Sequence, residues 1–309
     1  AEAASSDVIF FGEQHDDGNA HRLERSLLEA VSRRRSDVIL SLEMFERDVQ
    51  GLLDDYLAGK IDEPTFLKTA RPWPNYNVDY RPLVEFAKAK GWRVIAANVP
   101  RPIASAVSKQ GLAAAIGALP DSSRRWAATD FGCPKDDYFE RFGQSMGGHG
   151  PSTPEGMFRF YEAQCVKDET MAESIVRARS AGGSPLVIHM NGAFHSDYRD
   201  GTAERVARRG VKKITVLSAI PVPNLDTIEP KAERKKGEWL FFTLRVPTAP
   251  AAATETDTMI RATPLGDPST STPAINDSPR GGRPPSSAEP VSAPPAPSPL
   301  TPTPLQRTR

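Results

Sequence analysis

The sequence has little of several features that would assign it to a common class. It has two cysteines among 309 residues, Cys133 and Cys165, and neither has a second cysteine or a histidine at metal-ligand spacing. This excludes a disulfide-dense scaffold and a cysteine-rich zinc module. No apolar run approaches the roughly 18–20 residues of a membrane span. The 39 basic and 39 acidic residues cancel, so no nucleic-acid partner is expected, because such a partner requires a strongly basic face.

The last 63 residues lack Trp, Tyr and Phe altogether, and they contain 15 of the chain's 29 prolines. A segment of this composition cannot bury enough apolar surface to offset the entropy lost on ordering. We therefore predict a disordered tail over residues 247–309 and a single folded domain over residues 7–246. The tail alone would also suit a plain interaction domain with a polyproline segment.

The chain begins Ala-Glu-Ala-Ala-Ser-Ser rather than with methionine. Small residues of this kind remain after a secretory leader is cleaved. Residues 1–6 are therefore interpreted as a leader remnant, and a periplasmic or otherwise exported location is expected. In an oxidising compartment Cys133 and Cys165 would form one disulfide; two unlinked buried thiols are the alternative.

Short apolar runs alternate with helical periodicities along the domain. Strand, helix and strand within about 35 residues form a parallel unit with a right-handed crossover. We therefore predict an α/β fold: a mostly parallel sheet flanked by helices, with helical inserts (about 45–92 and 102–181) over the C-terminal edge of the sheet. The predicted strands are 7–12, 37–42 (ending on Glu43), 91–97, 185–190, 213–217 and 238–246.

Two of these strands are followed by the same motif, which is Gly12-Glu13-Gln14-His15 in one case and Gly192-Ala193-Phe194-His195 in the other. Ligands bind at the carboxyl ends of the strands in open α/β sheets. If the two strands are parallel, both terminal histidines lie at one rim. His189, inside a strand run, is expected to be a hydrogen-bonded core histidine, and His21, at the start of a helix, is expected on the solvated surface.

The strand ends offer the ligands of a first-row metal such as Zn²⁺, Mn²⁺ or Fe²⁺. His15, Glu43 and His195 are the candidate ligands, and Glu13 is the candidate base for a metal-bound water. The alternative is that these polar residues cap strand-to-helix loops. A serine nucleophile at Ser145 is not expected, because the surrounding Gly-x-Ser-x-Gly pattern follows a helix rather than a strand.

Aromatic and basic residues form a second candidate set. Tyr76 and Tyr80 lie in a segment rich in Trp and Pro, where a packed aromatic lid is the usual outcome. The functional interpretation is a phenol that ligates haem iron, with Arg81 or Arg101 as the cation that lowers a phenol pKa near ~10. The candidate cofactor contacts are Tyr76, Tyr80, Asn98, Arg101 and His149.

Taken in order, the chain contains Gly12-Glu13-x-His15, Glu43, Trp73 to Pro82, Ala97-Asn98-x-Pro100-Arg101, Ala163-Gln164-x-x-Lys167-Asp168-x-x-Met171-Ala172 and Gly192-x-x-His195. This series resembles the ChaN-like family of bacterial haem-binding, iron-regulated proteins. The wider superfamily includes erythromycin esterases and TIKI-type metalloproteases. The resemblance covers about residues 7–220.

The resemblance implies an exported protein that binds haem in iron or haem acquisition or handling. It is also compatible with a homodimer around haem and with association with the outer membrane or cell envelope. A tyrosine is the iron ligand in that family, and Tyr80 is the matching position, with Tyr76 second. In hydrolytic relatives the residues that match Glu13, His15, Glu43 and His195 hold metal or activate water, so a metal-dependent hydrolase is the alternative. The chain departs from the lipoprotein members in having no acylatable cysteine at its head, and it carries a bulky Phe194 inside the second motif.

Overall fold

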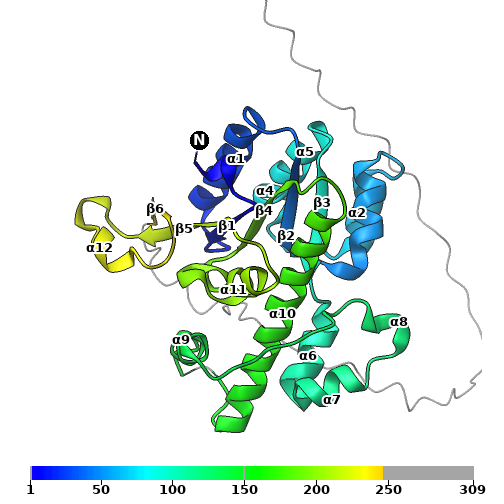
Figure 1. The fold of residues 1–309 in the computed structure, drawn as a ribbon, viewed down its shortest axis with the longest axis vertical. Coiled ribbons are helices and arrows are strands. Elements are labelled where there is room, and N and C mark those ends of the chain that lie inside the picture. Colours follow the sequence, from blue (N-terminus) through cyan, green and yellow to red (C-terminus); the bar gives the residue numbers. More distant parts are fainter. Residues whose placement is uncertain (1, 149, 246–309) are drawn as a thin grey trace, which may run out of the picture. The chain divides into compact units, whose positions relative to one another are not determined.

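The computed structural model of the protein describes residues 2–148 and 150–245 (Figure 1). Its centre is a six-stranded sheet with the order β3-β2-β4-β1-β5-β6, in which every neighbouring pair is parallel. The α/β prediction is confirmed, and the sheet is entirely rather than mostly parallel. The predicted tail lies outside the described residues. The strands are β1 (Val8–Glu13), β2 (Val38–Glu46), β3 (Arg93–Asn98), β4 (Leu186–Gly192), β5 (Ile214–Val222) and β6 (Trp239–Leu244).

Helices connect the strands and pack on both sides of the sheet (Figure 1). None of the described helices is both long and apolar enough to cross a membrane. The helices are α1 (Gly18–Ser32), α2 (Gln50–Leu57), α3 (Glu63–Ala70), α4 (Tyr76–Asp79), α5 (Arg81–Ala89), α6 (Arg101–Gln110), α7 (Leu112–Gly117), α8 (Asp121–Arg124), α9 (Asp137–Ser145), α10 (Pro154–Ser180), α11 (Gly201–Arg208) and α12 (Pro230–Glu233).

Different helices cover the two faces of the sheet, because successive side chains of a strand point in opposite directions. Ile9 and Phe11 of β1 belong to the core that includes α1 and α5. Val8 and Phe10 belong to the core that includes α10 and α11. Both sets are buried, which explains why β1 is an uninterrupted apolar run rather than an alternating pattern.

The C-terminal half of the long helix α10 packs against the sheet. The helix begins at Pro154, and its N-cap Thr153 accepts a hydrogen bond from Gly156 N. Its N-terminal half packs against α6, α7 and α9. In that half, Cys165 forms a disulfide with Cys133, with the two Cα atoms 5.6 Å apart. Of the two alternatives for the cysteines, the structure therefore contains the linked pair.

The strand β2 does not end on Glu43 as predicted but continues to Glu46. Its register with β3 shifts between Leu42 and Glu46, and Glu43 lies within this irregular stretch. Irregularities of this kind re-aim side chains. Glu43 Oε2 accepts a hydrogen bond from Gly192 N of β4 at 2.8 Å, so its carboxylate still reaches the carboxyl edge of the sheet.

Candidate functional site

The two Gly-x-x-His motifs meet at the carboxyl edge of the sheet. The strands β1 and β4 are parallel neighbours, and Glu13 is in register with Gly192. A Cβ atom on Gly192 would lie 2.7 Å from His15 Nε2. A Cβ atom on Gly12 would lie 2.9 Å from the Cα of Ala193. Each glycine therefore leaves the space that the other motif occupies, and the expected common rim is present.

Glu13 organises the first motif from a fully buried position. Its Oε1 lies 2.7 Å from His15 Nδ1 and accepts a hydrogen bond from the Tyr80 hydroxyl at 2.8 Å, and its Oε2 lies 2.8 Å from His21 Nδ1. Burial alone would raise the pKa of Glu13, but the hydrogen bonds from His15 and His21 lower it to about 2. Glu13 is therefore a carboxylate at neutral pH.

His15 is the part of the first motif that reaches solvent. Its side chain is 41% exposed, and its ring packs edge-to-face on Trp73 with the ring centroids 4.6 Å apart. Asn75 Nδ2 donates a hydrogen bond to the His15 carbonyl at 2.9 Å. Burial would lower the pKa of His15, but the hydrogen bond to Glu13 and the charge of Glu43 raise it. The ring is thus held in place and still accessible.

His21 was expected on the solvated surface, and this prediction was wrong. The residue is 5% exposed, and its Nδ1 lies 3.1 Å from Glu24 Oε2. Burial would lower its pKa, but hydrogen bonds and charges of Glu13 and Glu24 raise it to about 11. Residues three apart lie on one face of a helix, and Glu24 shares its face with the buried Leu28. The His21-x-x-Glu24 spacing beside that apolar face was the signal that would have identified the pair.

The second motif is enclosed. The His195 side chain is 3% exposed, its Nδ1 lies 2.6 Å from Asp168 Oδ1, and its Nε2 lies 3.3 Å from Glu43 Oε1. Burial would lower its pKa, but the charges of Glu43 and Asp168 raise it to about 10. Burial alone would raise the pKa of Glu43, but the charge and hydrogen bond of His195 bring this pKa well below its usual range. His195 is therefore an imidazolium between two carboxylates.

Asp168 of α10 fixes this imidazolium and was given no role from the sequence. It also accepts hydrogen bonds from the Tyr138 hydroxyl and from Thr202 Oγ1, each at 2.8 Å. Its partners come from α9, α11 and the loop after β4, which are far apart in the chain. Lys167, the residue before it, has its pKa lowered by burial, against the opposing charges of Glu43 and Asp168.

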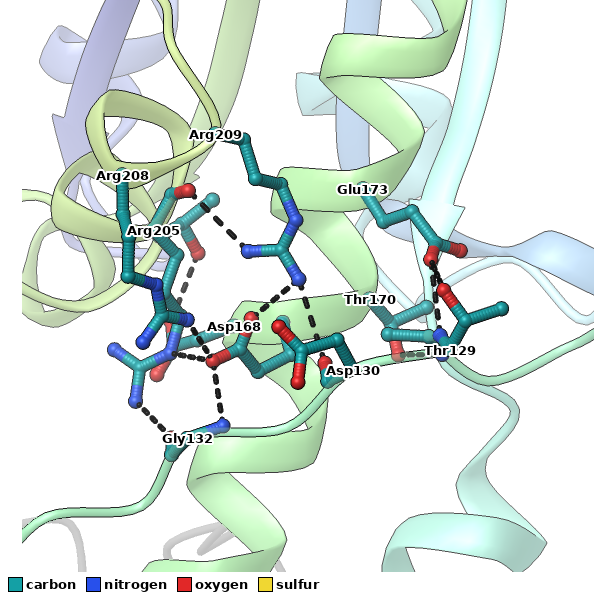
Figure 2. A network of polar contacts seen from close by, with 12 residues as sticks. Thr129, Asp130, Gly132, Asp168, Thr170, Glu173, Arg205, Arg208 and Arg209 are labelled. Carbon is teal, nitrogen blue, oxygen red and sulfur yellow. Dashed lines mark hydrogen bonds and ion pairs between the residues drawn. The ribbon is translucent and has the colours of Figure 1, made fainter.

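The helix α10 is itself fixed by a second carboxylate beside Asp168. Figure 2 shows arginines of α11 and its C-terminal end converging on this helix and the loop around Gly132. Glu169 accepts a hydrogen bond from Gly132 N at 2.9 Å. It pairs with Arg205 at 3.2 Å and Arg209 at 2.6 Å, and also with Arg208. The network joins α10, α11 and the loop, so the backbone that carries Asp168 is rigidly placed.

The two candidate tyrosines lie beneath the rim. Tyr80 is 0% exposed and Tyr76 is 2% exposed. Burial and the charge of Glu13 raise the pKa of Tyr80 far above its usual value. Arg81 pairs with Glu63 at 2.5 Å, and Arg101, whose side chain is 69% exposed, lies 3.5 Å from Glu46. The structure therefore places these two cations beside carboxylates rather than showing either one bonded to the phenol.

The remaining predicted residues have varied surroundings. Asn98 Nδ2 donates a hydrogen bond to the Glu43 carbonyl at 3.2 Å and thereby joins the end of β3 to the irregular stretch of β2. His149 lies outside the described residues. His189 is 0% exposed and hydrogen-bonded to Ser41 Oγ at 2.9 Å, and burial lowers its pKa to about 3. The expectation of a core histidine is confirmed.

Ser145 ends α9 and donates a hydrogen bond to the Phe142 carbonyl, which agrees with the rejection of a serine nucleophile.

Known proteins resemble this chain over most of its described length. Residues 1–206 match the family model described as haem-binding uptake, Tiki superfamily, ChaN. A structure described as cofacial heme binding to ChaN of Campylobacter jejuni has 17% sequence identity and a TM-score of 0.55, and the match covers 77% of this chain and 88% of that one. An open-conformation mutant of the erythromycin esterase EreC has 11% identity and a TM-score of 0.43, with 71% of each chain covered.

A curated relative comes from a plant. Protein RETICULATA-RELATED 5, chloroplastic, of Arabidopsis thaliana is 24% identical over 257 residues, which cover 78% of this chain and 34% of that protein. The chain thus spans about a third of the length of this relative. The family match includes both β1 and β4 with their Gly-x-x-His motifs and α10 between them. The chain belongs to the ChaN family of haem-binding uptake proteins, in the Tiki superfamily.

Proposed function

We propose that this protein binds haem at the rim of the first Gly-x-x-His motif and serves in haem or iron acquisition or handling outside the cytoplasm. The observation that carries the proposal is the half-exposed His15 ring, supported by Trp73 and held by Glu13, at the ligand-binding edge of the sheet in a chain of a haem-binding family. Val78 of α4, 78% exposed, adds apolar surface on the neighbouring helix.

The residue types at the rim fit haem. Imidazole and phenol are both haem-iron ligand types, and an indole ring beside them suits a flat apolar porphyrin. Haem supplies the iron, and the chain supplies ligands and shape. We propose Tyr80 as the iron ligand, with Tyr76 behind it, and Asn98 and Arg101 at the edge, where the exposed guanidinium of Arg101 suits a propionate.

Tyr80 can reach iron only if its surroundings open, because its hydroxyl is fully buried and hydrogen-bonded to Glu13. The proposal therefore includes an outward movement of α4 and the start of α5, which carry Tyr76 and Tyr80. A phenol that ligates iron as phenolate must lose its proton. Glu13 Oε1 lies 2.8 Å from the hydroxyl oxygen of Tyr80 and already accepts its hydrogen bond, so it is the acceptor in place for this proton. The burial of the phenol predicts slow binding at neutral pH, since its pKa is raised.

Export and assembly are further parts of the proposal. The disulfide between Cys133 and Cys165 supports export, because disulfides persist in oxidising compartments. The ChaN structure of Campylobacter jejuni, in which haem binding is described as cofacial, supports a homodimer that encloses haem between two copies. A mass measurement by light scattering with and without haemin tests the dimer.

The metal-dependent hydrolase is not adopted, because the family match favours haem and because His195 is enclosed by two carboxylates.

A haemin titration with matched variants tests the proposed function. We expect the wild-type protein to develop a saturable Soret band, and Tyr80→Phe to weaken binding at least tenfold and to lose the charge-transfer band of a ferric tyrosinate. Tyr56→Phe is the control, since the Tyr56 hydroxyl is likewise buried and donates to a carboxylate, that of Glu85.

The control variant should bind haemin as the wild type does. A band that is unchanged in Tyr80→Phe but lost in His15→Ala would contradict the ligand assignment and move the iron to the imidazole. Absence of saturable binding in the wild type would contradict the proposed function as a whole.

A further inference from the structure

A second group of metal-ligating side chains lies beneath the rim, distinct from the predicted set of His15, Glu43 and His195. It consists of Glu13 at the end of β1 with His21 and Glu24 on α1. We propose that this group, called here the α1 cluster, binds a divalent first-row transition ion. The proposal goes beyond haem binding and does not depend on it.

The geometry of the α1 cluster suits one small ion. His21 Nδ1 lies 2.8 Å from Glu13 Oε2 and 3.1 Å from Glu24 Oε2, and one donor atom from each residue falls within 4.8 Å of the others. Ligand atoms about 2.1 Å from a tetrahedral ion are roughly 3.4 Å apart. Small side-chain rotations would therefore admit an ion. All three residues are at least 95% buried, with exposed fractions of 1% for Glu13, 5% for His21 and 0% for Glu24.

One carboxylate oxygen of the α1 cluster, Glu24 Oε1, is buried and has no hydrogen-bond partner among the described residues. A single ring nitrogen, His21 Nδ1, faces both carboxylates and cannot donate one hydrogen fully to each. A buried carboxylate oxygen without a partner carries a desolvation penalty. Glu24 Oε1 therefore lacks a partner that a cation at the convergence of the three side chains would supply.

The other ring nitrogen of His21 is oriented as in a metal-ligating histidine. His21 Nε2 lies 3.2 Å from the His15 carbonyl oxygen, which can only accept a hydrogen bond. In the neutral ring, the hydrogen is therefore on Nε2, and the lone pair of Nδ1 faces the two carboxylates. Metal-bound histidines donate their second N–H to a carbonyl or carboxylate in this way. The Tyr80 hydroxyl, which donates to Glu13 Oε1, fixes one of the carboxylates in the same manner.

The charge and chemistry of the ligands define the class of ion. The pKa of His21 is raised to about 11 and burial raises that of Glu24, so an ion binds by displacing their protons. The two carboxylates and the neutral imidazole that remain carry a charge of −2, which a divalent ion neutralises, and buried charge is stable only when it is compensated. One nitrogen and two oxygen ligands suit Mn²⁺, Fe²⁺ or Zn²⁺ rather than an ion that prefers sulfur. Asp79 Oδ2, 3.7 Å from His21 Nε2 on a side chain that is 15% exposed, shows where the cluster approaches the surface.

The test uses haem-free, full-length protein and Zn²⁺, with bound zinc measured after dialysis and affinity measured by calorimetry. We expect one zinc per chain, and at least tenfold weaker binding in Glu24→Gln, which keeps the size of the side chain but removes its charge. Glu29→Gln is the control on the same helix, because the Glu29 side chain is 46% exposed. His195→Gln tests the other set of ligands.

Three results would overturn the proposal: no zinc in the wild type, equal binding in Glu24→Gln and wild type, or zinc lost in His195→Gln but retained in Glu24→Gln. The last result would place the ion at the rim.

Imidazole NMR of the wild type provides a second measurement that depends on no variant. Addition of Zn²⁺ should shift the Nδ1 resonance of His21 and leave that of His189 unchanged, and the absence of a shift at His21 overturns the proposal. Because the measurements contain no haem, a failure of haemin binding leaves them unaffected, and haemin binding by Glu24→Gln reports on the proposed function separately.

Discussion

The two Gly-x-x-His units have the same spacing and follow neighbouring parallel strands, yet their histidines have opposite environments. The His15 side chain is 41% exposed, whereas the His195 side chain is 3% exposed. His15 is held by one carboxylate, Glu13, at its Nδ1. His195 is held at both ring nitrogens by Asp168 and Glu43. The difference teaches that this motif places an imidazole at the rim but does not decide whether it faces a ligand.

The residues around each motif account for the difference. Phe194, inside the second motif, stacks on Tyr138 with the ring centroids 4.9 Å apart, and this contact joins the motif to α9. The Tyr138 hydroxyl in turn donates to Asp168. The first motif instead ends beside Trp73, which covers one edge of the ring. We infer that the second motif stabilises the fold and that the first is available for binding.

The largest effect is expected for Asp168→Asn, which removes the charge that faces His195 and alters two further hydrogen bonds. Breaking a buried ion pair from one side costs about 3–5 kcal/mol, so the free energy of unfolding in urea should fall by about that amount. Asp137→Asn, at an exposed position, is the control and should change it by less than about 1 kcal/mol. Equal losses in both variants would show that the second motif is not the stabilising one.

Gly192→Ala tests whether the two motifs depend on each other. The new Cβ would lie 2.7 Å from His15 Nε2 and 2.9 Å from its Cε1, so the imidazole must move. Overpacking of this kind costs about 1–3 kcal/mol, and haemin affinity should fall at least tenfold. Gly51→Ala, where a Cβ meets nothing within 4 Å, serves as the control for both measurements. Unchanged haemin affinity in Gly192→Ala would remove His15 from the site.

A pH series distinguishes the second motif by its charge. The pKa of His195 is raised to about 10 in the folded protein, against about 6.5 when unfolded. Its contribution to stability is therefore complete below pH 6.5 and is lost as the pH rises towards 10. The difference in unfolding free energy between wild type and His195→Gln should be larger at pH 6.5 than at pH 9.5, by at least about 1 kcal/mol. A constant difference would mean that His195 is neutral.

The smallest effect on stability is expected for His15→Gln. The side chain is partly exposed, and its one carboxylate partner is Glu13. In the variant, Glu13 retains its contacts with His21 and Tyr80. Its loss should change the free energy of unfolding by less than about 1 kcal/mol, since exposed ion pairs contribute little. The same variant should weaken haemin binding. A stability loss as large as that of Asp168→Asn would erase the contrast between the motifs.

The sequence predicts the sheet and the meeting of the motifs well, because apolar runs that stop at glycine carry strong local information. It places Glu43 wrongly at a strand end, since a register shift between β2 and β3 depends on the partner strand. It also places His21 at the surface: the spacing from Glu24 beside the apolar face of α1 was a sign of burial, but the contact with Glu13 of β1 depends on the tertiary fold. Asp168 could be noticed in the resemblance but not assigned, since its partners Tyr138 and Thr202 lie 30 and 34 residues away.

The most direct test of the contrast between the motifs is a titration with gallium protoporphyrin, a diamagnetic haem analogue, followed by NMR of the histidine ring nitrogens. We predict that the His15 resonances shift and saturate with the porphyrin, while those of His195 and His189 stay close to their starting positions. A shift confined to His195, or no shift at His15 at saturation, would contradict the account.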